Sequence, residues 1–336
     1  MRYGDWGVRS SRWSGVRSEM IDVCGVSVHY LATGAGPAAA LNAPTQLLVH
    51  PLAASGSFML DLIRPLSAYG PVVAPDLPGT IFGHTPTPRV NAPRVEHNAR
   101  FLRAFTSALG LDRVVVHGWS MGAVVGLRFA ADTPERVERL ILATPPLPVP
   151  LTAPQRLVCQ TLGRLLLLAG PPLARALARL WGRRAIDRKL AVLDGTVPTG
   201  FDELGGDPSR IAPDNIALWS EQFAELRAHP ERMGHAATAL ASVVSGLVVD
   251  SRPTLAAIDR IAVPVLVLWG DQDPVIERSM IDHVLARRPD WDLHVLESSG
   301  HLAPLEVPER YAEAVGRWLS QPSATGVHDL GPNPAT

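Results

Sequence analysis

The sequence lacks several features that would point at once to a class of protein. Only two cysteines occur among 336 residues, without the spacing of metal ligands, which excludes a disulfide-stapled scaffold and a cysteine metal site. We expect Cys24 and Cys159 to be small buried apolar residues, which is compatible with a reducing cytoplasm. Neither sign of charge is in excess, since 31 basic residues meet 32 acidic ones. This balance argues against a nucleic-acid partner.

Long apolar runs are also missing. Residues 165–169 form one of the longest uninterrupted runs, far short of the roughly 20 residues that a membrane-spanning helix needs. The first twenty residues hold arginine and tryptophan but no apolar core of the length that a signal peptide requires. We therefore expect a cytoplasmic protein without a stable membrane span. Hydrophobic residues nevertheless make up 46% of the chain, enough for a sizeable core.

Short apolar segments alternate along the chain with longer segments of helical period. Two strands are expected around Gly25, and six more at residues 46–50, 71–76, 113–118, 139–144, 263–270 and 291–298. Helices are expected at residues 95–109, 121–131, 280–288 and 308–319. This alternation predicts an α/β fold, in which a mostly parallel sheet is covered by helices on both faces.

Three stretches depart from that alternation. Residues 1–20 and 321–336 are rich in Gly, Ser, Pro and polar residues, so we expect both to be disordered extensions. Residues 145–258 contain no clear strand and are too long for a loop in a compact domain. They predict a helical insertion between two parts of one core, at residues 21–144 and 259–320.

The first segment of this insertion, residues 155–185, has leucines at near-helical spacing with arginines between them. One interpretation is a set of amphipathic helices that fold over the sheet. The alternative is an interfacial membrane helix of the basic, apolar type. The two interpretations do not exclude each other.

The stretch VVVHGWSMGAVVG, residues 114–126, runs from a predicted strand into a predicted helix through Gly-Trp-Ser-Met-Gly. A G-x-S-x-G sequence at such a turn holds its serine, here Ser120, in a strained backbone conformation with the hydroxyl exposed. Side chains at Gly118 or Gly122 would collide with the neighbouring strand or helix. Met121 opens the helix, so its backbone N–H is free to stabilise an oxyanion beside Ser120.

A nucleophilic serine needs a base, and the base needs an orienting carboxylate. His301 follows a predicted strand in LESSGHLAPLEVPERYAEAV, at the carboxyl edge of the sheet that also holds Ser120. The segment VLVLWGDQDPV ends another strand and offers Asp271 and Asp273. Asp273 is preferred because it lies deeper in the loop and Pro274 fixes the turn, whereas Asp271 is expected to bond the loop backbone.

Together these motifs resemble the α/β-hydrolase superfamily, in the branch that carries a helical cap. The resemblance covers residues 21–319 and includes IDVCGVSVHYLATGAGP, the strand end at His50, the loop DLPG, the elbow GWSMG, WGDQDPV and SSGHLAPLEVPERYAEAVGRWL. The order Ser120, Asp273, His301 is the order of that family's triad. The resemblance implies the α/β-hydrolase fold, with an eight-stranded sheet and an inserted cap. It also implies Ser120 as nucleophile, Asp273 as orienting acid and His301 as base.

An oxyanion hole made of two backbone N–H groups is also implied by the resemblance. Met121, which follows the nucleophile, would supply one. The second would come from the loop after His50, where the family usually has glycine and this chain has Pro51. Proline has no N–H, so Leu52 is the candidate donor.

The resemblance further implies hydrolysis of an ester, lactone or related carbonyl bond through an acyl-enzyme, with no metal or organic cofactor. Carbon–carbon bond hydrolases of ring-cleavage products, perhydrolases, and acyltransferases or lyases with the same triad remain alternatives. Haloalkane dehalogenases and epoxide hydrolases are disfavoured because they need a carboxylate nucleophile. A catalytically silent binding module is disfavoured because the triad is complete.

The insertion is expected to choose the substrate. Its Leu, Ala and Val content indicates an apolar pocket for a small hydrophobic molecule, with Trp119, Trp181 and Trp219 as candidate substrate-binding residues. The competing interpretation is that the residues of the insertion are only its own core. We expect a monomer or a homodimer.

Overall fold

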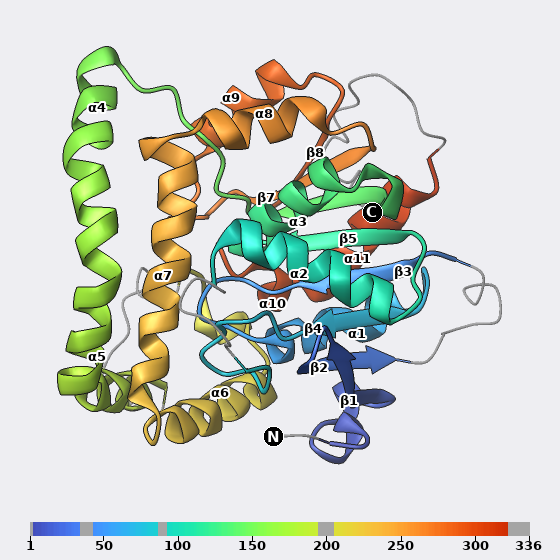
Figure 1. The fold of residues 1–336 in the computed structure, drawn as a ribbon. Helices are drawn as coiled ribbons and strands as arrows, with labels where there is room; N and C mark the ends of the chain where they lie inside the picture. Colours follow the sequence, from blue (N-terminus) through green and yellow to red (C-terminus); the bar gives the residue numbers. More distant parts are fainter. Residues whose placement is uncertain (1–2, 34–42, 87–92, 194–204, 322–336) are drawn as a thin grey trace.

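One sheet of eight strands organises the molecule, in the spatial order β1-β2-β4-β3-β5-β6-β7-β8 (Figure 1). The computed structural model describes residues 3–33, 43–86, 93–193 and 205–321. Pairing is antiparallel between β1 and β2 and between β2 and β4, and parallel elsewhere. The strands are β1 (Val16–Val23), β2 (Val26–Thr33), β3 (Thr45–Val49), β4 (Val72–Pro75), β5 (Val114–Trp119), β6 (Val137–Ala143), β7 (Val265–Gly270) and β8 (Asp292–Leu296). The predicted α/β fold with a mostly parallel eight-stranded sheet is confirmed.

The central strands are nearly continuous apolar runs because helices cover both faces of the sheet. Every residue of β3, β5 and β7 is buried, and their sequences TQLLV, VVVHGW and VLVLWG hold mainly Val and Leu. The edge strand β1, by contrast, has a mixed pattern of buried and exposed residues. The carboxyl ends of β5, β7 and β8 lie at one edge of the sheet, which brings the loops after them together.

Eleven α-helices are formed by the described residues: α1 (Leu60–Leu66), α2 (Val95–Ala108), α3 (Met121–Asp132), α4 (Ala153–Val158), α5 (Arg164–Leu193), α6 (Pro213–Leu226), α7 (Met233–Val244), α8 (Arg252–Arg260), α9 (Arg278–Arg287), α10 (Ala303–Glu306) and α11 (Pro308–Leu319). Helices α2, α3, α8 and α9 pack in one buried cluster of the sheet, and α1, α10 and α11 pack in the other. The four predicted helices agree with α2, α3, α9 and α11 to within two residues at each end.

The first twenty residues are not a disordered extension, at least from residue 3 onward. Trp6 and Trp13 are fully buried, and β1 already begins at Val16. The Trp13 indole Nε1 donates to Asp61 Oδ1 at 2.7 Å, which fixes the segment to α1. The prediction was wrong because the polar and glycine-rich composition concealed two isolated tryptophans. The expected disordered tail lies, from residue 322, outside the described residues.

The N-terminal segment also ties α6 to the core. The Arg9 guanidinium donates to both carboxylate oxygens of Glu221, at 2.7 and 2.8 Å. The buried Asp61 accepts from Trp13 and, at 2.7 Å, from the Asn215 amide on α6. Three parts of the chain that are far apart in sequence therefore meet at one carboxylate.

Helices α4 to α8 lie between β6 and β7 in the sequence. The helix formed by α4, a π-helical turn (Cys159–Gly163) and α5 spans residues 153–193, and we call it the outer helix. It runs along the edge of the molecule with α7 beside it (Figure 1). The expected end of the insertion at residue 258 falls inside α8, whose Ala257 and Ile258 are buried in the core.

The two cysteines differ from the expectation that both are buried. Cys24 is exposed in the turn between β1 and β2, where its φ is 53°. Cys159 is half-buried in the π-helical turn of the outer helix. The prediction was wrong because the preference of cysteine for the core does not apply to a residue placed in a two-residue hairpin turn.

Candidate active site

Ser120 lies on the sharp turn from β5 into α3. Its backbone angles are φ 52° and ψ −117°, a strained conformation for a residue with a side chain. A Cβ at Gly118 would lie 2.4 Å from the carbonyl oxygen of Gly122, and a Cβ at Gly122 would lie 2.1 Å from that of Val49. Both glycines are therefore required for the turn to pass between β3 and α3.

A continuous chain of hydrogen bonds joins the three residues that the sequence analysis selected. Ser120 Oγ lies 2.9 Å from His301 Nε2, and His301 Nδ1 lies 2.9 Å from Asp273 Oδ2. A carboxylate only accepts, which assigns the proton to Nδ1 and leaves Nε2 to accept from the serine hydroxyl. The imidazole is thus oriented to take the serine proton.

Asp273, rather than Asp271, is the carboxylate that reaches His301. The Asp273 side chain is fully buried, and its second oxygen accepts from the backbone N–H groups of Val275 and Ile276 at 2.8 and 2.9 Å. These two donors fix the carboxylate in the turn after β7. Asp271 is exposed and accepts from the Ser299 N–H, as expected for a residue that bonds the loop.

The loop that carries His301 is anchored on both sides. The Trp119 indole Nε1 donates to the His301 carbonyl at 3.0 Å, and Trp119 itself is 1% exposed. On the other side, the Glu306 carboxylate accepts from the backbone N–H groups of Gly300 and Asp207. Burial raises the pKa of Glu306. Trp119 was expected to bind substrate, but the structure buries it as an anchor of the histidine loop.

The two predicted oxyanion donors lie close together. Met121 is the first residue of α3, so no carbonyl of that helix accepts its N–H. Leu52 is half-buried in the loop after β3, and Leu52 and Met121 line the same small cavity of about 10 Å³. A space of that size is about large enough for one water molecule.

A neutral histidine shapes the loop that carries Leu52. The His50 ring Nδ1 bonds the Pro51 carbonyl at 2.8 Å, and Nε2 accepts from the Leu77 N–H at 3.1 Å. The second bond requires an unprotonated Nε2, and burial lowers the pKa of His50 accordingly. Pro51 therefore contributes its carbonyl to the loop, although it has no N–H to donate.

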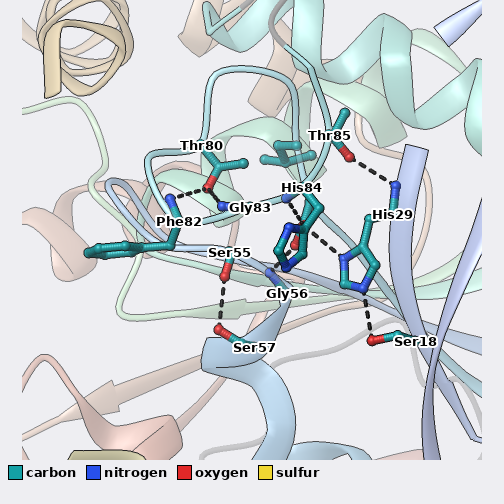
Figure 2. Close-up of polar contacts among 12 residues, drawn as sticks. Ser18, His29, Ser55, Gly56, Ser57, Thr80, Phe82, Gly83, His84 and Thr85 are labelled. Atoms are coloured by element: carbon teal, nitrogen blue, oxygen red, sulfur yellow. Dashed lines mark hydrogen bonds and ion pairs between the residues drawn. The ribbon is translucent and has the colours of Figure 1, made fainter. Parts of the chain in front are cut away.

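Asp76 fixes the same loop from the other side. It accepts from the Gly56 N–H at 2.8 Å, the His84 N–H at 2.7 Å and the His29 ring Nδ1 at 2.8 Å. Figure 2 labels these three donor residues. Burial alone would raise the pKa of Asp76, but the hydrogen bond and charge of His29 and the two N–H groups outweigh it. They lower that pKa to about 2. The loop between Asp76 and His84 is therefore held by its own carboxylate.

Sequence reasoning missed a second chain of Ser, His and Asp side chains. His29 Nε2 lies 2.9 Å from Ser18 Oγ (Figure 2), while Nδ1 bonds Asp76. Ser18 lies inside strand β1, where no helix N-terminus offers N–H groups to an oxyanion, and its hydroxyl already accepts from Trp6 Nε1. Ser18, His29 and Asp76 therefore support the structure and do not form a second catalytic triad. Of the three, only Asp76 lies in a motif that the sequence singled out, the loop DLPG.

Aromatic side chains gather beside the loop that carries Leu52. Phe58 stacks on Trp219 and on Phe82, with ring centroids 5.0 and 5.8 Å apart, and Phe82 meets Phe223 edge-on at 4.8 Å. Ala53, next to Leu52, packs against the same cluster. Trp219 thus belongs to a cluster beside the loop that carries Leu52, and it is almost fully buried.

Trp181 and a large cavity lie apart from the triad. Trp181 is 53% exposed on the outer helix, so the structure does not bring this predicted residue to the site. A cavity of about 610 Å³ is lined by residues of α2, α3, α5, α7 and α8, and none of Ser120, Asp273 and His301 lines it. Across residues 3–33, 43–86, 93–193 and 205–321, no three His, Cys, Asp or Glu side chains gather as metal ligands would.

Comparison with known proteins relates this geometry to a family. Residues 46–314 match the model of the alpha/beta hydrolase family. The 2-hydroxy-6-oxononadienedioate/2-hydroxy-6-oxononatrienedioate hydrolase 2 of Pseudomonas putida is 26% identical over 321 residues, which cover 91% of this chain and 95% of that protein. The N-formylmaleamate deformylase of Pseudomonas putida is 26% identical over 219 residues, or 65% of this chain and 68% of that one.

Among solved structures, a bacterial membrane phospholipase A superposes with a TM-score of 0.64 at 23% identity, over 93% of this chain and 88% of that one. That identity supports a shared fold only. The family match covers most of the chain, and the Pseudomonas putida protein matched over 95% of its length is a hydrolase. The chain belongs to the alpha/beta hydrolase family and is an enzyme of that hydrolase class, acting on a small molecule.

Proposed function

We propose that this hydrolase cleaves an ester, lactone or related carbonyl bond of a small hydrophobic substrate through an acyl-enzyme on Ser120. The observation that carries the proposal is the unbroken chain of hydrogen bonds from Ser120 Oγ through His301 to Asp273. The strained turn exposes the hydroxyl, and the start of α3 lies directly behind it. These are the parts that nucleophilic acyl transfer needs.

In the first half of the reaction, His301 Nε2 accepts the proton of Ser120 Oγ as the oxygen attacks the substrate carbonyl. The backbone N–H groups of Met121 and Leu52 stabilise the negative oxygen that forms. Asp273 keeps the proton on Nδ1 and stabilises the charged imidazole. The histidine then gives its proton to the leaving group, and the serine remains acylated.

In the second half, water attacks the acyl carbon while His301 Nε2 accepts its proton. The bond to Ser120 Oγ breaks, the histidine returns the proton to that oxygen, and the acid is released. Water enters as the only co-reactant, so the proposed hydrolysis balances without an oxidant or reductant.

The hydrophobic character of the substrate is supported by the aromatic cluster. Phe58, Phe82, Trp219 and Phe223 lie beside the loop that carries Leu52, next to Ala53. Such a cluster favours an apolar acyl or aromatic group over a charged one, since a charge placed there would lose its hydration.

The nucleophile is tested by labelling the protein with a fluorophosphonate probe. Ser279, an exposed serine on α9, provides the control variant. Wild type and Ser279→Ala should be labelled by the probe, and Ser120→Ala should not. The same three proteins are then assayed with p-nitrophenyl esters of increasing chain length, where the Ser120 variant should lose hydrolysis. Labelling that persists in Ser120→Ala would overturn the assignment.

Carbon–carbon bond hydrolysis is the second candidate, and the Pseudomonas relative that matches almost the full chain favours it. In that reaction the same triad would act on a ketone of a ring-cleavage product instead of an ester. The two candidates separate when the decay of a coloured 2-hydroxy-6-oxodienoate is followed beside the ester panel. A protein that labels at Ser120 but cleaves only the dienoate supports the second candidate, and one that cleaves neither points to acyl transfer.

A further inference from the structure

The outer helix, residues 153–193, covers the body of the molecule with only one of its faces. At a rise of 1.5 Å per residue its 41 residues extend roughly 60 Å. From Arg175 onward its inner face packs closely: Ala178 and Ile186 are buried, Gly182 lies against Pro230, and Arg175 bonds Thr238 on α7. Before Arg175 the same face borders the cavity of about 610 Å³. This face holds small residues where the helix approaches the body.

The opposite face of the outer helix is apolar and exposed. Of fourteen large apolar side chains that are exposed in the described part of the chain, ten belong to this helix, with exposed fractions between 38% and 74%. They are Leu157, Val158, Leu162, Leu165, Leu166, Leu168, Leu173, Leu177, Leu180 and Trp181. Leu168 differs from the other nine, because it lines the cavity of about 610 Å³ on the inner side of the helix. Most recur every three or four residues and form a stripe along the helix. A stripe of this kind is unusual on a surface that only meets water.

The formal charge of the outer helix indicates which kind of partner could cover this stripe. The outer helix holds seven arginines, one lysine and one acidic residue, a formal charge of +7. The rest of the chain holds 23 basic and 31 acidic residues, a formal charge of −8. Arg179, Arg183 and Arg184 are exposed beside the stripe. A positive charge is thus concentrated on the one surface that is also apolar.

A second copy of the chain fits this surface poorly. The commonest dimers place the same patch of both subunits face to face, so that a helix of charge +7 would meet another of charge +7. Anionic phospholipids, by contrast, offer an apolar layer below a layer of negative phosphates. Their chemistry matches both properties of the surface at once.

The properties of the outer helix suit the surface of a membrane better than a span across it. Residues 153–191 and 230–249 are both long enough for a span, and each contains an 18-residue window with a mean hydropathy of 1.3. The apolar window of the first is fully outside the protein core, whereas 28% of the second is buried. Arg164 interrupts the apolar segment, and the contacts of α5 with α6 and α7 prevent lipid from surrounding the helix. We propose that the exposed face of the outer helix binds the protein to the surface of an anionic phospholipid membrane.

The test measures binding of the whole chain to vesicles and is independent of catalysis, so it also works with Ser120→Ala. Wild type should float with vesicles of phosphatidylcholine and phosphatidylglycerol, bind pure phosphatidylcholine at least about tenfold more weakly, and detach as salt rises. The triple variant Leu162→Gln, Leu166→Gln, Leu173→Gln should weaken binding to the anionic vesicles by more than about tenfold.

A second variant separates charge from apolar burial. Arg179→Gln, Arg183→Gln, Arg184→Gln should remove the preference for anionic vesicles, while the double variant Val8→Gln, Met20→Gln, exposed apolar residues elsewhere, should bind as wild type does. Unchanged thermal melting of each variant shows that folding is intact. Wild type that ignores anionic vesicles, or leucine variants that bind as wild type does, would overturn the proposal. So would a wild-type dimer in solution that the leucine variant converts to monomer.

Discussion

The Trp119 indole Nε1 donates a hydrogen bond to the backbone carbonyl of His301 at 3.0 Å. Trp119, which precedes the proposed nucleophile Ser120, therefore holds the backbone of His301, the proposed base. This side chain, which is 1% exposed, thus links the turn that carries Ser120 to the loop that carries His301. Placement of the imidazole depends on that contact as much as on Asp273.

Trp119→Phe should lower kcat by about tenfold and change KM little, because the ring still fills its site but no longer fixes the histidine loop. Steady-state kinetics on the preferred p-nitrophenyl ester checks this. Trp291→Phe is the matched control, since Trp291 is equally buried and its Nε1 bonds nothing in the described part of the protein. Equal losses in both variants would show that only packing matters.

Asp273→Asn should reduce kcat/KM by roughly 10⁴, because an amide donor facing Nδ1 selects the wrong tautomer of His301. Asp271→Asn, in the same loop but exposed and bonded to Ser299, should stay within a few fold of wild type. Hydrolysis rates of the two purified variants measure the difference. A larger loss in the Asp271 variant would exchange the two roles.

Trp13→Ala should destabilise the protein by about 3 to 5 kcal/mol, because it removes a fully buried indole and leaves Asp61 without one donor. Urea unfolding followed by circular dichroism gives this free energy. Val8→Ala in the same segment, where the side chain is 83% exposed, should change it by less than about 0.5 kcal/mol. A Trp13 variant as stable as wild type would mean that the segment is dispensable.

Asp76 should contribute acid-sensitive stability. Its pKa falls from 3.8 to about 2 on folding, so its contribution is complete above pH 3.8 and is lost as the pH falls toward 2. The shift corresponds to roughly 2 kcal/mol. Unfolding free energies measured from pH 6 to pH 2 should therefore converge for wild type and Asp76→Asn. Parallel curves would show that the carboxylate is not the acid-sensitive group.

The fold was predictable where local sequence carries the signal. Strands such as VVVHGW and VLVLWG are buried on both faces, so their apolar runs stand out without tertiary information. The elbow was equally readable, because the clash at Gly118 and Gly122 is set by the turn itself. Ser120, Asp273 and His301 were found from strand ends that share one edge of the sheet.

The features that the sequence did not predict depend on contacts between segments that are distant in the chain. Trp6 and Trp13 are isolated in a polar stretch, and their burial depends on partners such as Asp61 on α1. The link between Ser18, His29 and Asp76 joins two strands and a loop that no short motif connects. Helical spacing showed that one face of residues 155–185 is apolar, but not that this face points away from the core.

The N-terminal segment holds α6 and, with it, part of the aromatic cluster beside the candidate site. Arg9 bonds Glu221, and Asp61 bonds Asn215, both on α6. Trp219 stands between these two residues on the same helix and stacks on Phe58. A substitution at Arg9 or Asp61 would therefore act on the aromatic cluster from a distance, through the position of α6.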